Sequence, residues 1–166
     1  MNNIIGSSIT SLARSIRKGH VSSQEVVSAF LERIYEVNVQ VNAVVQIAHD
    51  RALSESKIAD RKLRDGVEVG ILHGIPFTVK DNIETKDLVC ACGTEGLANN
   101  IPVSDADVVS RMQDAGAILL GKTNVPELGM GYETDNLVYG RTNNPYDLNR
   151  TSGGSSGGES AIVASG

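Results

Sequence analysis

The chain has 166 residues, of which 40% are apolar, 21% charged and 4% aromatic, and its formal net charge is −5. This length suits one ordinary domain with a sizeable core. The negative charge argues against a nucleic-acid-binding protein, which would need a basic surface to offset phosphate. No apolar run approaches the roughly 20 residues that span a bilayer, and residues 1–6 lack the features of a signal peptide. We therefore expect a cytoplasmic protein without a membrane or direct nucleic-acid partner.

The amino-terminal part of the chain is predicted to be mainly helical. Residues 11–18 form a first helix, and Ser22 and Glu25 have the spacing of a capping box that begins a second. This second helix has an apolar stripe at helical spacing, made of Val26, Val27, Phe30, Leu31 and Ile34. Residues 43–47 are expected to form a short strand and residues 49–64 a third helix.

Strands and helices are predicted to alternate in the rest of the chain. The β-branched segment 73–82 is typical of a buried strand that places Lys80 at its carboxyl end. A helix capped by Ser104 should precede a short buried strand at residues 117–120, and residues 159–164 are again helical in pattern. The alternation favours an α/β layer architecture with a largely parallel sheet.

Residues 116–123 match the P-loop pattern G-x-x-x-x-G-K-[ST]. That motif binds phosphate only where a strand precedes it and a helix begins at the Lys-Thr pair. Here a predicted helix leads into Gly116, and the residues between the two glycines form an apolar strand. We therefore interpret Lys122 as a loop lysine. Nucleotide binding stays an alternative, which would require ATP-dependent thermal stabilisation that is abolished by Lys122→Ala.

Residues 153–157 match the nucleophile elbow G-x-S-x-G of α/β-hydrolases. An elbow needs a buried strand before the serine and a histidine later in the chain. Turn-forming residues at 143–151 precede Ser155, however, and no histidine follows it. A flexible Gly/Ser linker is the simpler interpretation, although the segment leads directly into a helix, whose first N–H groups favour anions.

The cysteines and histidines give no sign of a metal or redox site. Cys90 and Cys92 are too close together for a zinc or redox pair, and the three histidines have no ligand spacing, at His20, His49 and His73. We predict structural roles for these histidines and expect neither a metal nor a cofactor.

Lys80 and the serine pair Ser155–Ser156 form a third signal. A lysine alone is usually a surface residue, but burial lowers the pKa of a lysine and allows it to act as a general base. A serine hydroxyl both accepts and donates a hydrogen bond, so Ser155 is suited to pass a proton between Lys80 and a nucleophile. The flanking glycines permit backbone conformations that other residues resist.

Four blocks of the sequence between residues 74 and 159 resemble the amidase signature family, and with the two amino-terminal helices the resemblance covers essentially the whole chain. The blocks are residues 74–82 (GIPFTVKDN), 121–128 (GKTNVPEL), 139–147 (YGRTNNPYD) and 153–159 (GGSSGGE). The resemblance implies a Ser–cis-Ser–Lys triad that hydrolyses carboxylic amides, on an α/β fold whose mixed sheet lies between helical layers. Lys80 would be the catalytic lysine and Ser155 the bridging serine, joined to Gly154 by a cis peptide bond. Gly154 and Ser156 would be supporting residues.

The family pattern also contains a later Gly-Gly-Ser segment, which holds the nucleophilic serine and the oxyanion hole. Ser160 and Ser165 do not follow a double glycine, so neither is assigned this role. The resemblance thus implies a partial domain, with amino-terminal helices in residues 1–65 and the start of the catalytic core in 66–166. Strands without their partners should leave open edges and apolar faces.

These considerations predict a small-molecule amide substrate and negligible activity for residues 1–166 alone. The missing carboxyl-terminal part and a second copy of the chain are the candidate partners. Two alternatives stay open: the A subunit of a tRNA-dependent amidotransferase, and a non-catalytic remnant or interaction module. Residues 132–136 favour a general amide hydrolase over the transamidating subunit.

Overall fold

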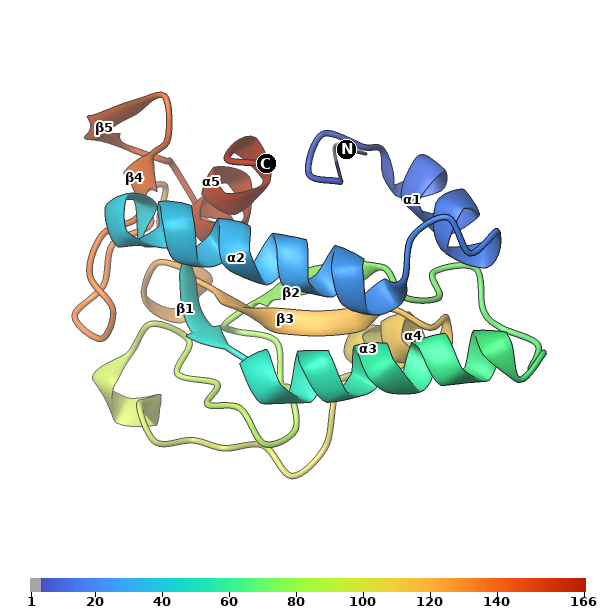
Figure 1. Cartoon of the computed structure of the whole chain (residues 1–166). Coiled ribbons are helices and arrows are strands. Elements are labelled where there is room, and N and C mark those ends of the chain that lie inside the picture. The colour runs from blue at the N-terminus through green and yellow to red at the C-terminus, as the bar shows by residue number, and fades with distance from the viewer. Residues whose placement is uncertain (1–3) are drawn as a thin grey trace.

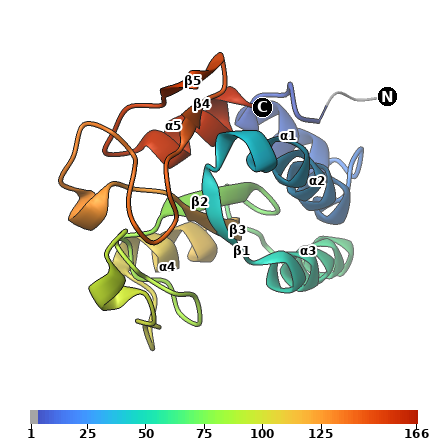
Figure 2. The ribbon, with the colours of Figure 1, turned by 90° about the vertical axis from the view of Figure 1, so that its left-hand side faces the viewer.

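The computed structural model describes residues 4–166, so half of the amino-terminal segment tested for signal-peptide features lies outside the described residues. A three-stranded sheet lies between two groups of helices. The helices are α1 (Ile9–Arg17), α2 (Ser23–Val41), α3 (His49–Arg64), α4 (Asp107–Asp114) and α5 (Gly157–Ala164). Helices α1, α2 and α5 lie on one side of the sheet and α4 on the other, while α3 packs beside α2 and against strand β3 (Ile118–Thr123) (Figures 1 and 2). The predicted α/β fold with a sheet between helical layers is confirmed.

The sheet has the strand order β1-β3-β2, formed by β1 (Val44–Ile47), β3 (Ile118–Thr123) and β2 (Pro76–Lys80). β2 and β3 are parallel, as expected for strands joined by a helical crossover through α4. β1 pairs with β3 in the antiparallel direction. The sheet is therefore mixed, as the family resemblance implied, and not largely parallel, as the alternation alone suggested.

Two helices follow local sequence signals closely. Helix α2 begins with the predicted capping box: the Ser22 hydroxyl accepts from the Glu25 N–H at 3.0 Å, and the Glu25 carboxylate accepts from the Ser22 N–H at 2.8 Å. Helix α3 has the predicted bounds. Helix α1 begins two residues earlier than expected, because Ser8 caps it by accepting from the Ser11 N–H.

The prediction that Ser104 caps the next helix is wrong. Helix α4 begins at Asp107, and its N-cap residue is Ala106, which has no capping side chain. The preceding residues are bound elsewhere: the Asp105 carboxylate accepts from the Lys86 N–H at 2.7 Å, and the Ala106 N–H donates to the Glu84 carbonyl at 2.9 Å. These contacts hold the segment to the loop after β2 and delay the start of the helix.

A short hairpin replaces the predicted turn before the serine pair. It consists of β4 (Asn143–Asn144) and β5 (Asp147–Thr151), and most of β5 is exposed. Helix α5 starts at Gly157, two residues before the predicted 159–164 segment. No helix within residues 4–166 is both long enough and apolar enough to cross a bilayer.

The main core lies where the helices meet the sheet. It joins apolar side chains of α2, β1, α3, β3 and α5, among them Val27, Leu31, Ile34, Val44, Ala52, Ile118, Leu120 and Ile162. A smaller cluster on the other face of β2 and β3 packs Val79 and Leu119 against Val109 of α4. Both faces of β3 are therefore covered by buried apolar side chains, whereas in β2 only Val79 is buried.

Candidate active site

Lys80 and Ser155 lie in contact although 75 residues separate them in the sequence. The Lys80 Nζ donates a hydrogen bond to the Ser155 Oγ at 3.2 Å. Lys80 is the last residue of β2, as predicted, but this strand is only partly buried, and Lys80 itself is half-buried. The prediction of a buried strand was wrong because β2 occupies an edge of the three-stranded sheet.

The backbone around Ser155 has the unusual geometry that the family resemblance implied. The peptide bond between Gly154 and Ser155 is cis. A side chain at Gly154 would collide with the neighbouring loop, since its Cβ would lie 2.9 Å from the Gly131 oxygen and 3.0 Å from the Tyr132 carbonyl carbon. Glycine is therefore required here by close packing of backbone on backbone.

Ser156 lies beside Ser155 but is exposed, and its side chain makes no capping bond to α5. The start of α5 is held by other groups. The Gly157 N–H donates to the buried Thr134 Oγ1 at 3.0 Å, and the Gly158 N–H donates to the Asn124 carbonyl at 3.2 Å. These contacts place the serine pair over the ends of the strands.

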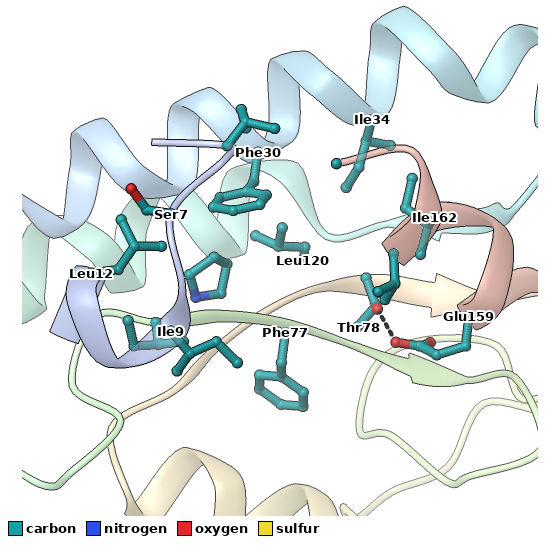
Figure 3. Close-up of a pocket in the computed structure, with 15 residues that line it drawn as sticks. Ser7, Ile9, Leu12, Phe30, Ile34, Phe77, Thr78, Leu120, Glu159 and Ile162 are labelled. Carbon is teal, nitrogen blue, oxygen red and sulfur yellow. Dashed lines mark hydrogen bonds between the residues drawn. The ribbon is translucent and has the colours of Figure 1, made fainter. Parts of the chain in front are cut away.

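Sequence reasoning missed a carboxylate on the same face of the sheet. Glu159, in the first turn of α5, accepts hydrogen bonds from the hydroxyls of Thr78 in β2 and Thr123 in β3, at 2.7 and 2.8 Å. Figure 3 shows the bond between Glu159 and Thr78. The only signal for Glu159 in the sequence was its place at the end of the GGSSGGE block.

Lys122 is wrongly predicted as a loop residue. It lies inside β3 and is fully buried. Its ammonium donates to the Ile83 carbonyl and to the Thr85 Oγ1, the latter at 3.4 Å. β3 continues through Lys122 because this residue pairs with Val79 of β2 and Gln46 of β1. The P-loop alternative loses its basis, since Lys122 is enclosed and a strand occupies the place of the phosphate-binding loop.

Asp81 follows Lys80 but belongs to the buried cluster around Lys122. It is fully buried, and its Oδ1 accepts from the Gln46 Nε2 at 3.2 Å. Burial raises the pKa of the Asp81 carboxyl, while the nearby Lys122 ammonium opposes this change. Burial likewise lowers the pKa of Lys122, against the effect of Cys90 and Asp81. The hydrogen bonds from Lys122 to Ile83 and Thr85 hold the loop after β2 against β3.

Two of the remaining candidate ligands, Cys90 and His73, are buried and hydrogen-bonded to backbone carbonyls. The Cys90 thiol donates to the Asp81 carbonyl at 3.0 Å, and burial raises the pKa of this thiol to about 12, so that it stays protonated. His73 is buried with its Nε2 3.1 Å from the Ala59 carbonyl oxygen. In residues 4–166 no three His, Cys, Asp or Glu side chains gather in a way that would hold a metal ion.

The geometry therefore brings together an amine and a hydroxyl suited to proton transfer. The serine accepts from a lysine, and the segment before it is an exposed hairpin, so the arrangement differs from a nucleophile elbow, which needs a histidine partner and a buried strand. Of the sequence-predicted site residues, Lys80 and Ser155 are in contact, Gly154 forms the cis bond to Ser155, and Ser156 is exposed.

Known proteins resemble this chain in both sequence and fold. The family model described as Amidase matches residues 25–166. The A subunit of the glutamyl-tRNA(Gln) amidotransferase of Alkaliphilus metalliredigens is 43% identical over 155 residues, which are 91% of this chain and 32% of the relative. The chain thus spans about a third of the length of the curated relatives it matches.

Solved structures of amide hydrolases have the same fold as this chain. A fatty acid amide hydrolase superposes with a TM-score of 0.94 at 34% identity, covering 98% of this chain and 29% of that one. The peptide amidase of Stenotrophomonas maltophilia superposes with a TM-score of 0.89 at 34% identity, covering 96% of this chain and 34% of that one. With four matching sequence blocks, a matching family model and a shared fold, the chain belongs to the amidase family, with the amidase-signature fold.

Proposed function

We propose that this chain supplies the base and the proton relay of a carbon–nitrogen hydrolase of the Ser–cis-Ser–Lys type. The observation that carries the proposal is the hydrogen bond between the Lys80 Nζ and the Ser155 Oγ, at 3.2 Å, beside the cis bond after Gly154. A lysine–serine pair is an established variant of the triad, in which lysine takes the place of histidine. The proposed substrate is a small carboxylic amide.

In the proposed mechanism, uncharged Lys80 accepts the proton of Ser155 while Ser155 takes the proton of a nucleophilic serine. The nucleophile then attacks the amide carbonyl, the amine or ammonia leaves with a returned proton, and water cleaves the acyl-enzyme. Ser155 can serve as the relay because one hydroxyl donates and accepts at the same time. Residues 1–166 supply the first two groups of this sequence.

The nucleophile and the oxyanion hole are assigned to a Gly-Gly-Ser segment beyond Glu159, which residues 160–166 do not contain. Each oxyanion donor contributes about 3 kcal/mol to stabilising the transition state. A chain with a base and a relay alone therefore has little catalytic power. We expect negligible amide hydrolysis from residues 1–166, and we treat them as the amino-terminal helices and the start of the catalytic core.

The test compares this chain with the product of any reading frame that continues past the Gly166 codon. The longer product should hydrolyse simple carboxylic amides, and Lys80→Ala and Ser155→Ala should each lower kcat/KM by roughly 10³-fold. Lys57→Ala, which changes an exposed lysine of α3, is the matched control and should keep full activity. Turnover by the 166-residue chain that Lys80→Ala abolishes would contradict the need for a later segment.

A second candidate is the A subunit of a tRNA-dependent amidotransferase, since relatives 39 to 43% identical to this chain bear that name. In that case other subunits and a glutamyl-tRNA would be the partners. Amide transfer to glutamyl-tRNA only in the presence of partner subunits would favour this candidate. Hydrolysis of simple amides without a partner would favour the general hydrolase.

The third candidate is a non-catalytic remnant or interaction module. It requires a natural stop codon directly after Gly166, together with stable expression of the chain in the absence of a partner.

A further inference from the structure

Glu159 links the helix that follows Ser155 to the strand that carries Lys80. Its two carboxylate oxygens are used separately: Oε1 accepts from the Thr78 hydroxyl at 2.7 Å, and Oε2 accepts from the Thr123 hydroxyl at 2.8 Å. One side chain thereby bridges both parallel strands of the sheet. Figure 3 shows Glu159 reaching from α5 toward Thr78 on β2.

The register of the strands places this bridge next to Lys80. Thr123 is the partner of Lys80 in the parallel pair of β2 and β3. Thr78 precedes Lys80 by two residues, so the two side chains project from the same face of β2. Glu159 in turn follows Ser155 by four residues. Two chain segments and two hydrogen bonds therefore form a closed ring. The chain joins Ser155 to Glu159 and Thr78 to Lys80, and hydrogen bonds join Glu159 to Thr78 and Lys80 to Ser155.

The other contacts at the start of α5 lead away from β2. Gly157 binds Thr134, and Gly158 binds the backbone of Asn124, where an added Cβ would lie only 2.4 Å from the Asn124 nitrogen. The N-cap residue Ser156 contributes no side-chain bond. Glu159 is also favourably placed for its charge, since the first turn of a helix stabilises an anion.

We infer that Glu159 is a positioning residue, which fixes the distance between Lys80 and Ser155 by clamping α5 to β2 and β3. An effect of this clamp on catalysis rests on the proposed function, whereas its effect on the distance between Lys80 and Ser155 does not. Threonine hydroxyls both accept and donate. A glutamine at position 159 should therefore keep both contacts, with one of them reversed, whereas an alanine removes both.

The test follows the side chain of Lys80 by NMR in the 166-residue chain labelled with ¹³C at the lysine Cε. The chain has six lysines, so the Lys80 signal can be assigned with Lys80→Arg. Ser155→Ala removes the hydroxyl that Lys80 contacts, so the chemical shift of Lys80 in this variant is the reference for loss of the contact. We expect Glu159→Ala to shift the Lys80 signal in the same direction, and Glu159→Gln to restore its wild-type position.

Glu127→Ala is the matched control, because Glu127 also accepts a threonine hydroxyl, from Thr94 at 2.7 Å, but lies outside the ring of contacts. It should leave the Lys80 signal unchanged. The backbone amide spectrum reports whether each variant is folded. If Glu159→Ala does not fold, Thr78→Val and Thr123→Val each remove one of the two bonds and should shift the same signal.

The outcomes separate the clamp from the proposed function. If Ser155→Ala shifts the Lys80 signal and neither Glu159→Ala nor the valine variants do, the clamp is refuted and the lysine–serine pair stands. If Ser155→Ala itself leaves the signal unchanged, the Lys80–Ser155 contact does not exist in solution, and both the clamp and the proposed function are overturned.

Discussion

Two lysines on neighbouring strands face opposite sides of the sheet and have different surroundings. Val79, not Lys80, is the register partner of Lys122, so the side chains of Lys80 and Lys122 project from opposite faces. Lys122 is enclosed and bound to oxygens, whereas Lys80 is half-buried and reaches a single hydroxyl. Of the two, Lys80 is the more accessible, which its proposed role as a general base requires.

Another buried residue makes the stability of the chain depend on pH. Burial lowers the pKa of His73, with Lys62 and Arg17 adding to this effect and the Ala59 carbonyl and Asp60 opposing it. In the unfolded chain the His73 imidazole binds a proton at about pH 6.5, whereas in the folded chain it does so only at a lower pH. The contribution of neutral His73 to the free energy of unfolding is therefore complete above about pH 6.5 and is lost as the pH falls toward the lowered pKa.

Thermal unfolding should accordingly show a lower Tm at about pH 5.5 than at about pH 7.5. His73→Gln, which keeps a donor for the Ala59 carbonyl, should reduce this difference. His20→Gln removes an exposed imidazole and is the matched control for a substitution of this type. A pH dependence of Tm that is identical in His73→Gln and the wild type would contradict the assignment.

At the scale of elements, the loop after β2 is attached to the sheet by buried polar groups. Gln46 of β1 donates to both Asp81 and the Val89 carbonyl and accepts from the Val89 N–H. Lys122 of β3 binds the same loop at Ile83. Because this loop leaves the sheet directly after Lys80, its anchoring fixes the strand end on which Lys80 lies.

Removal of the Lys122 charge should therefore destabilise the chain strongly. Lys122→Met leaves Asp81 buried without its opposing charge, and losses of this kind cost about 3–5 kcal/mol. Since the pKa of Asp81 would rise further, the loss should be larger at about pH 8 than at about pH 5. Denaturant unfolding measures both effects, and adding Asp81→Asn should recover part of the stability.

Lys57→Met, at an exposed position of α3, should change the free energy of unfolding by less than about 0.5 kcal/mol. An equally small change in Lys122→Met would show that the buried pair does not support the loop.

At the scale of the whole molecule, the sheet has an open edge beside an apolar groove. β2 forms this edge, and the groove, which encloses about 340 Å³, lies between α1, α2, α5 and β2 (Figure 3). Its lining includes Ile9, Leu12, Phe30, Ile34, Leu120, Ile162 and Val163. These features fit the expectation that strands without partners leave apolar surface exposed.

The groove should bind an apolar fluorescent dye under native conditions. Ile9 and Val163 are 60% and 71% exposed, so replacing both with serine should lower dye fluorescence several-fold with little effect on stability. The control pair Val39→Ser and Val103→Ser changes side chains that are 89% and 90% exposed and lie outside the groove. Equal loss of fluorescence in both pairs would show that the dye does not bind in the groove.

The sequence alone determined the features that depend on neighbours in the chain. The capping box of Ser22 and Glu25 and the bounds of α3 follow from contacts between residues three or four positions apart, which a linear pattern records. The pairing of Lys80 with Ser155 came from a family motif, since no periodicity joins residues 75 positions apart. The tertiary structure decided the antiparallel place of β1, the burial of Lys122 and the bridge from Glu159 to Thr78. Each of these depends on strand register and on side chains that meet only after the sheet has formed, and the order of residues in the chain does not encode them locally.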